Sequence, residues 1–225
     1  MRLTTTMLLA ASLAACTTKQ DTTADSAAAS VAASHDADVA AQGTGVPAGY
    51  TAVTDDSAAK LTSVRFAPTG GNWDVTTGPA HIVYADKDTA SGTYTASATF
   101  AQLEAPRHPE AYGLFIGGRD LGTPARTYTY FVVRGSGELL VKTRDGAKTN
   151  DVVAWRANGA VPKADSSGKA TYRLAVRVAA DSVRFMVNDK QVAAVKAGSI
   201  PTTGVAGLRI NHNLHVLTAP VSISR

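Results

Sequence analysis

Apolar and polar side chains alternate strictly in parts of the C-terminal half of the chain. Over 171–178 every second residue is apolar, beginning with Tyr172 and Leu174. This period of two is typical of a β-strand, because successive side chains of a strand point to opposite faces. Residues 182–187 repeat the pattern, and Asn188-Asp189-Lys190 supplies a turn before 191–195. The sequence therefore predicts a β-hairpin here.

Similar short patterns, separated by Gly- and Ser-rich turns, recur from residue 60 onward. The further strand candidates are 81–84, 92–100, 112–116, 128–133, 138–142, 151–155, 204–210 and 221–224. No segment after residue 60 combines a helix cap with an apolar stripe of helical period. About 166 residues are available for one domain of ordinary size. The prediction is an all-β fold of about 12 strands, arranged as an antiparallel β-sandwich of the jelly-roll type.

The order of several motifs in this part of the chain is similar to that of concanavalin-A-like jelly rolls. The motifs are YGLFIGGR at 112–119, YTYFVV at 128–133, GELLVK at 137–142, YRLAVRV at 172–178, VRFMVNDKQV at 183–192 and GVAGLR at 204–209. Within that group the chain most resembles laminin-G-like domains and the domain of bacterial 3-keto-disaccharide hydrolases. The resemblance implies the fold but includes no catalytic signature, and fold alone does not establish function.

The first 16 residues have the features of an export signal. Arg2 is followed by an uncharged, largely apolar run from Leu3 to Ala15, too short to span a bilayer as a permanent helix. Leu13-Ala14-Ala15-Cys16 resembles the lipobox of bacterial lipoproteins, whose Cys is diacylated and becomes the new N-terminus. Cys16 is the single Cys of the chain, so no intramolecular disulfide is expected. The resemblance implies an exported protein held in the lipid bilayer, and Thr17 after the Cys implies the outer membrane of a diderm bacterium.

Residues 17–59 differ in composition from the rest of the chain. They are rich in Ala, Ser and Thr and carry six Asp against the single Lys19. Large apolar residues are nearly absent, so the segment cannot bury enough surface to offset its chain entropy. It is predicted to be a disordered tether, and 60–225 the folded domain. That domain is basic, with 20 Lys and Arg against 12 Asp and Glu.

A carbohydrate site would need an aromatic side chain for the apolar face of a sugar and polar groups for its hydroxyls. The aromatic candidates are Trp73, Tyr112, Tyr128, Tyr130 and Trp155. Ionisable residues are densest in the loop that contains His108 and Glu110, and Arg119 follows the next strand. The alternative interpretation is that the aromatic residues belong to the core and that the ionisable residues lie in a solvated loop without a ligand.

The case for catalysis is weaker. Glycoside hydrolysis needs two carboxyl groups about 5–10 Å apart. The candidates are Glu104 and Glu110, with His108, in a loop that contains Pro106 and Pro109. No strand carries a pair of Glu residues at the spacing that such glycosidases use.

No metal or cofactor is expected. Asp86-Lys87-Asp88 has some likeness to a calcium loop, but the following residues supply no further acidic ligand, so a polar hairpin turn is favoured. His212 and His215 are three apart and would point to opposite faces of a strand, which argues against zinc. Arg173, Arg177 and Arg184 are predicted on outer strand faces, without a nucleic-acid-binding motif.

These observations leave three hypotheses of different classes. The leading one is an anchored lipoprotein whose jelly roll binds carbohydrate or a cell-envelope glycan without catalysis. The second is a glycoside or keto-disaccharide hydrolase or lyase. The third is a structural or protein-interaction lipoprotein.

Overall fold

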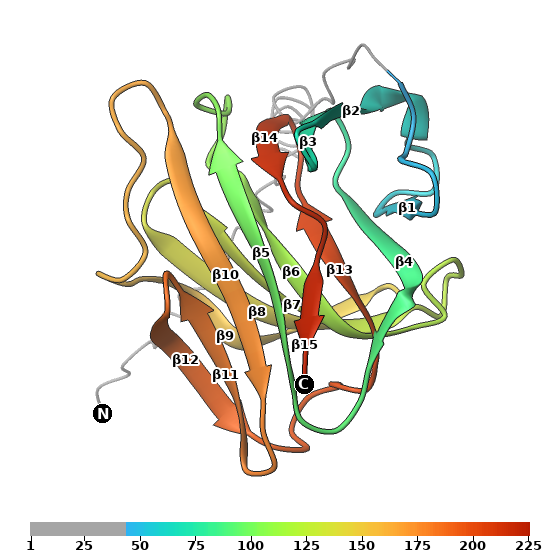
Figure 1. Ribbon diagram of the computed structural model, residues 1–225, viewed down its shortest axis with the longest axis vertical. Coiled ribbons are helices and arrows are strands. Elements are labelled where there is room, and N and C mark those ends of the chain that lie inside the picture. The colour runs from blue at the N-terminus through green and yellow to red at the C-terminus, as the bar shows by residue number, and fades with distance from the viewer. Residues whose placement is uncertain (1–43) are drawn as a thin grey trace, which may run out of the picture. The chain divides into compact units, whose positions relative to one another are not determined.

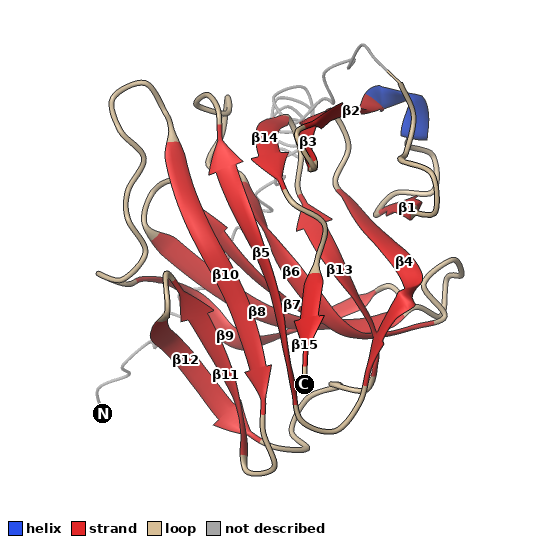
Figure 2. Ribbon diagram, viewed as in Figure 1, coloured by secondary structure: helices blue, strands red, loops and turns tan. Residues whose placement is uncertain are grey.

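The computed structural model describes residues 44–225. The predicted signal peptide, Cys16 and most of the predicted tether lie outside these residues. The described part consists of β-strands and one short 3-10 turn, η1 (Leu61–Ser63). No helix in this part is long and apolar enough to cross a membrane. The prediction of an all-β fold is therefore confirmed, and Figure 2 shows strands throughout.

The strands form two antiparallel sheets packed face to face (Figure 1). The seven-stranded sheet has the order β1-β4-β13-β6-β7-β8-β9. Its strands are β1 (Thr51–Thr54), β4 (His81–Ala90), β6 (Ala111–Arg119), β7 (Thr127–Arg134), β8 (Glu138–Asp145), β9 (Lys148–Ala157) and β13 (Gly204–Ile210).

The eight-stranded sheet has the order β12-β11-β10-β5-β14-β3-β2, and β15 also pairs with β5. Its strands are β2 (Val64–Thr69), β3 (Asn72–Thr77), β5 (Tyr94–Gln102), β10 (Ala170–Val178), β11 (Ser182–Val187), β12 (Lys190–Lys196), β14 (Leu214–Thr218) and β15 (Ser222–Ser224). The predicted hairpin is confirmed: β11 and β12 are joined through Asn188 and Asp189, whose φ values are 48° and 64°. Two residues of positive φ are what a tight hairpin turn requires.

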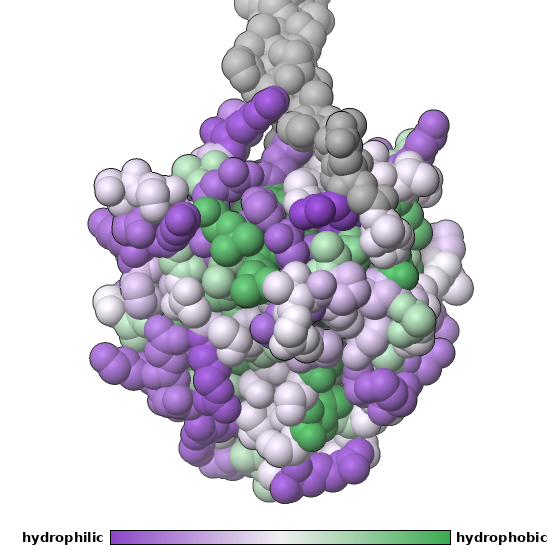
Figure 3. Space-filling model, turned by 45° about the horizontal axis from the view of Figure 1, so that its top comes forward, coloured by the Kyte–Doolittle hydropathy of each residue, from purple (hydrophilic) through white to green (hydrophobic). Residues whose placement is uncertain are grey.

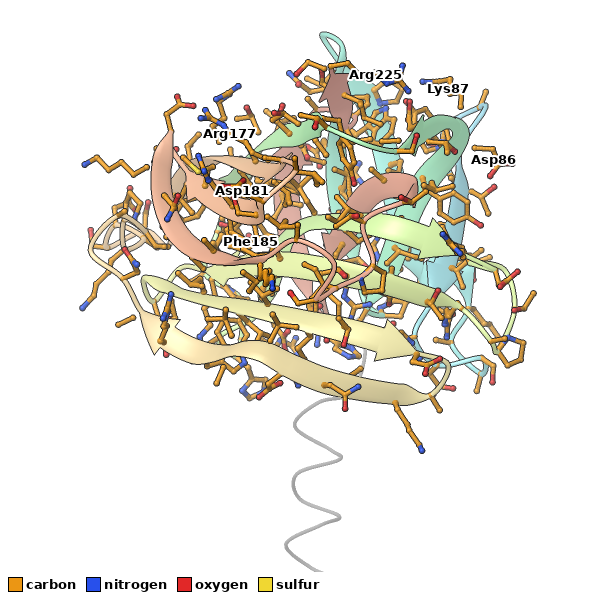
Figure 4. All side chains as sticks on the ribbon, turned by 90° about the horizontal axis from the view of Figure 1, so that it is seen from below. Asp86, Lys87, Arg177, Asp181, Phe185 and Arg225 are labelled. Carbon is orange, nitrogen blue, oxygen red and sulfur yellow. The ribbon has the colours of Figure 1, made fainter. Side chains whose placement is uncertain are left out.

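The main core lies between the sheets and follows the predicted alternation. Tyr172, Leu174 and Val176 of β10 are buried there, as are the alternate residues of the facing strands. Phe185 of β11 packs against Phe131 of β7 across the interface, with ring centroids 5.4 Å apart. Figure 4 shows the two layers with Phe185 between them. Every second side chain therefore remains for the two outer faces, and these are the surfaces on which a site can form.

The predicted boundary at residue 60 is wrong, because part of the segment predicted as tether belongs to the sandwich. β1 pairs with β4 in register Thr51 to Tyr84. Tyr50 packs edge-on against Trp73 with centroids 4.6 Å apart, and the hydroxyl of Thr44 donates to the carbonyl of Phe66. A four-residue edge strand is too short for its alternation to stand out from Ala- and Thr-rich neighbours.

Asp86, Lys87 and Asp88 do not form the predicted hairpin turn. They lie within β4, which continues to Ala90, and the turn follows around Gly92, whose φ is +68°. The register between β4 and β13 shifts between Val205 and Gly207. Asp86, Lys87 and Asp88 therefore have no register partners on β13 and form a bulge within β4.

Candidate functional site

One large aromatic side chain stands out on the surface of the described residues. Trp155 of β9 is 37% exposed and lies on the outer face of the seven-stranded sheet. The guanidinium carbon of Arg134, from β7, lies 4.2 Å from the centroid of the Trp155 ring. A cation at this distance over the ring is attracted to the face of the indole. Trp155 is thus the predicted aromatic residue that the fold leaves available to a ligand.

The hairpin between β7 and β8 completes this arrangement. Arg134 and Glu138 are register partners across the turn, and Nε of Arg134 donates to Oε2 of Glu138 at 2.9 Å. The hydroxyl of Ser136 in the turn donates to the same oxygen at 2.6 Å. These two hydrogen bonds hold the pKa of Glu138 below its usual value. We call Trp155, Arg134, Glu138 and Ser136 the Trp155 platform.

A hollow of about 450 Å³ adjoins the platform through Ser136. Its walls are the loop of residues 105–110, the β7–β8 turn and the turn of residues 164–168, with Gln102 of β5 at its edge. The loop contributes His108 and Glu110, two of the residues predicted from the sequence. The structure therefore brings His108, Glu110 and the Trp155 platform to one end of the sandwich.

A second polar group lies further along the same outer face, where β1 ends. Asp55 receives hydrogen bonds from Nη1 of Arg209 at 2.6 Å and from Nη1 of Arg144 at 2.9 Å, and Nη2 of Arg209 donates to its other oxygen. Arg126 donates to the backbone carbonyls of Thr54 and Asp55, each at 3.0 Å. We call Asp55, Arg126, Arg144 and Arg209 the Asp55 cluster.

Burial and charge act in opposite directions within the Asp55 cluster. Burial alone would raise the pKa of Asp55, but the hydrogen bond from Arg209 and the charges of all three arginines lower it overall. The side chain of Arg209 is only 7% exposed, and its guanidinium also lies 5.4 Å from the ring centroid of Tyr130. Asp55 therefore stays ionised, and three guanidinium groups surround one carboxylate.

Several predicted ligand residues occupy other positions. Trp73 and Tyr112 are buried in the main core, so both are removed from the set of candidates. Tyr128 is buried beside Phe115 on the outer face, and Tyr130 is half-buried beside it. Arg119 donates to the carbonyl of Thr203 at 3.2 Å and lines a different hollow.

The weaker candidates are likewise dispersed. Glu104 faces His215 of β14, with Oε1 3.6 Å from Nδ1, and so does not share the hollow of Glu110. Nε2 of His215 lies 3.0 Å from Oδ1 of Asp74. Asp88 accepts a hydrogen bond from Lys87 at 3.0 Å. Among residues 44–225 no group of three or more His, Cys, Asp or Glu side chains could hold a metal ion.

The outer face of the eight-stranded sheet has a different character. Arg173, Arg177 and Arg184 point outward and are each about half exposed, as predicted. Figure 3 looks onto this side of the molecule from above and shows mostly polar side chains with small, separate apolar patches.

The described residues form a sandwich of two antiparallel sheets of the jelly-roll type. Carbohydrate-binding module CBM66 from Bacillus subtilis has this fold, with a TM-score of 0.58 and 11% identity over 82% of this chain and 100% of that module. A Bacillus subtilis protein of unknown function with a galectin-like fold gives a TM-score of 0.56 and 12% identity, covering 77% of this chain and 88% of its own.

A family 7 alginate lyase is more distant, with a TM-score of 0.47 and 14% identity over 71% of this chain and 82% of its own. Comparison with protein-family models and with curated protein sequences finds no match. At these identities the likeness establishes the fold, which is one that carbohydrate-binding proteins use.

Proposed function

We propose that this chain is a lipid-anchored protein whose sandwich binds carbohydrate, without catalysis, at the Trp155 platform. The observation that carries the proposal is the exposed Trp155 ring held by Arg134 beside an ionised Glu138. A pyranose presents an apolar face that can stack on an indole and hydroxyl groups that pair with planar polar groups. The platform supplies both kinds of partner on rigid strands.

The protonation state of Glu138 supports binding over hydrolysis at the platform. A general acid for glycoside cleavage needs a carboxyl group whose pKa is raised, so that it carries a proton near neutral pH. Hydrogen bonds from Arg134 and Ser136 lower the pKa of Glu138 instead. Glu138 is therefore suited to accept hydrogen bonds from sugar hydroxyls.

The anchor in this proposal is Cys16, which lies outside the described residues. Its support is the sequence Leu13-Ala14-Ala15-Cys16 after a short apolar run. Two acyl chains on one Cys give stable membrane binding, where one chain gives only marginal binding. Cys16→Ala should move the protein from the membrane fraction to the soluble fraction, and membrane retention of that variant would overturn the anchor.

The binding proposal is tested with a glycan array probed by the full-length protein and by two variants. Trp155→Ala removes the exposed ring and should lower binding to the recognised glycan by about tenfold or more. Leu61→Ala is the matched control, because Leu61 is 40% exposed and lies away from the platform. Absence of binding to every glycan, or equal loss in both variants, would overturn the proposal.

A hydrolase or lyase remains the alternative function, favoured by one observation. The hollow beside the platform is lined by His108, Glu110 and Asp165, a set of side chains that could exchange protons with a sugar. Incubation of the protein with the glycans it binds, followed by mass analysis, distinguishes the two functions. New products that disappear in Glu110→Gln would favour the enzyme.

A further inference from the structure

The Asp55 cluster has more positive charge than its carboxylate can balance. Arg126, Arg144 and Arg209 face one acidic side chain, and a hollow of about 330 Å³ opens beside them. Asp55 is the single acidic residue among those lining this hollow. The neighbouring Asp56 does not line it, and its carboxylate accepts a hydrogen bond from the amide of Ala58. Asp145 lines a second hollow, which Arg119 and Arg144 also line.

The guanidinium groups at the hollow also retain hydrogen-bonding capacity. Arg144 donates through Nε to the carbonyl of Gly146 and through Nη1 to Asp55, which leaves Nη2 without a described partner. Nε of Arg126 has no hydrogen-bond partner among the described residues but is buried, so the accessible donor at the hollow is that of Arg144. Arginine forks held in this way are the protein groups best suited to carboxylate and sulfate oxygens.

The position of the cluster relates it to the Trp155 platform. β8 contributes Glu138 to the platform and Arg144 to the cluster, and both side chains are on the outer face. They are six positions apart on an extended strand, a distance of about 20 Å. Lys142 lies between the two on the same face. An extended saccharide of several residues could therefore contact both groups.

We infer that the hollow beside Arg126 and Arg144 binds a carboxylate or sulfate group of an acidic saccharide chain, a neighbouring part of which lies on the Trp155 platform. This inference rests on the proposed function, whose ligand class it specifies. Arg209, which is buried, and the half-buried Asp55 form the base of the anion site, because their mutual ion pair holds the surrounding guanidinium groups in place. Arg144 is the principal ligand-binding residue.

The test compares two probes with the same sugar backbone and different charge. Hexagalacturonate and its fully methyl-esterified form are titrated into the full-length protein by calorimetry. The charged form should bind about tenfold more tightly or better, as expected for hydrogen bonds to a charged group. This preference should weaken between about 0.05 M and about 0.5 M NaCl because salt screens the anion.

Two variants of Arg144 test whether this residue causes the preference for the charged probe. Arg144→Gln should reduce the preference for the charged probe to less than about twofold, while Asp55 keeps its pair with Arg209. Arg144→Lys keeps the charge without the planar fork and should give an intermediate preference. Arg173→Gln, on the opposite sheet, is the matched control and should leave the preference unchanged. Thermal unfolding of each variant checks that the fold is retained.

The outcomes separate this inference from the proposed function. Equal binding of both probes would overturn the acidic-group site and leave carbohydrate binding at the platform intact. If Arg144→Gln still prefers the charged probe, the inference is also overturned, because another part of the protein would then bind the carboxylate groups. Binding of neither probe overturns it as well, and the glycan array with Trp155→Ala then decides whether carbohydrate binding itself fails.

Discussion

The two outer faces of the sandwich carry Arg–Asp pairs that look alike in sequence and differ in environment. On the seven-stranded sheet, Arg209 and Asp55 are 7% and 31% exposed. On the eight-stranded sheet, Arg173 and Asp189 are 49% and 63% exposed. Water and salt screen the second pair, whereas the first lies among packed side chains where charges interact more strongly.

The difference in exposure between the two ion pairs indicates which of them the fold depends on. The pair of Arg209 and Asp55 joins β13 to the end of β1, over 154 positions of sequence, and so holds the N-terminal edge of the sandwich. Arg177 and Asp181 lie near the β10–β11 connection at the other face (Figure 4). There the ion pairs link neighbours that the backbone already holds together. Burial, more than pairing, determines how much each charge contributes to stability.

Removal of the shared carboxylate should give the largest effect. Asp55→Ala leaves Arg209 buried without its partner, so we expect a loss of about 3–5 kcal/mol in the free energy of unfolding. Urea denaturation followed by the fluorescence of the Trp residues measures this loss. Asp189→Ala is the matched control on the exposed face. A loss of less than about 1 kcal/mol for Asp55→Ala would show that the two faces are equivalent.

His81, beneath the same edge of the seven-stranded sheet, should make stability pH-dependent. Burial lowers its pKa to about 4, and the charge of Arg209 adds to this effect. The folded protein therefore favours neutral His81, and the resulting stability is present above the unfolded pKa of about 6.5. It is lost as pH falls from about 6.5 to about 4, by roughly 3 kcal/mol in total.

Denaturation at a series of pH values tests this assignment. His81→Phe should flatten the dependence between about pH 6.5 and about pH 4. The pKa of Asp55 is lowered from 3.8, so its contribution is present above that value and declines only at still lower pH. The variant should therefore retain the decline below about pH 4. An unchanged slope in His81→Phe would assign the pH dependence to other groups.

Much of the fold could be predicted from the sequence because local alternation is enough to identify long strands. β10 and β11 show this, since the residues that they contribute to the main core follow the period of two. β1 and β14 could not be identified in this way. They are four and five residues long, and each has a Thr, Thr54 or Thr218, at a buried position where an apolar residue would complete the pattern.

The candidate site was partly predictable for the same reason. Trp155, His108 and Glu110 belong to residue types that attract attention in a sequence. Arg134 and Glu138 can be recognised as a pair only from the register of the hairpin. The sequence Arg134-Gly135-Ser136-Gly137-Glu138 carries a usable signal, because a tight turn places an acid and a base opposite each other. No local signal could connect Asp55 with Arg209, since only the complete sheet topology brings them together.

The smallest expected effect is on the exposed face, and it requires a double-mutant cycle. Arg173→Ala, Asp189→Ala and the double variant should give a coupling energy of about 0.2–1 kcal/mol, since both side chains are largely in water. Asp189 also has φ 64° in the hairpin turn, so its replacement alters turn strain. That contribution is present in both the single and the double variant and cancels in the cycle. A coupling above about 2 kcal/mol, or one unaffected by high salt, would contradict the contrast between the two faces.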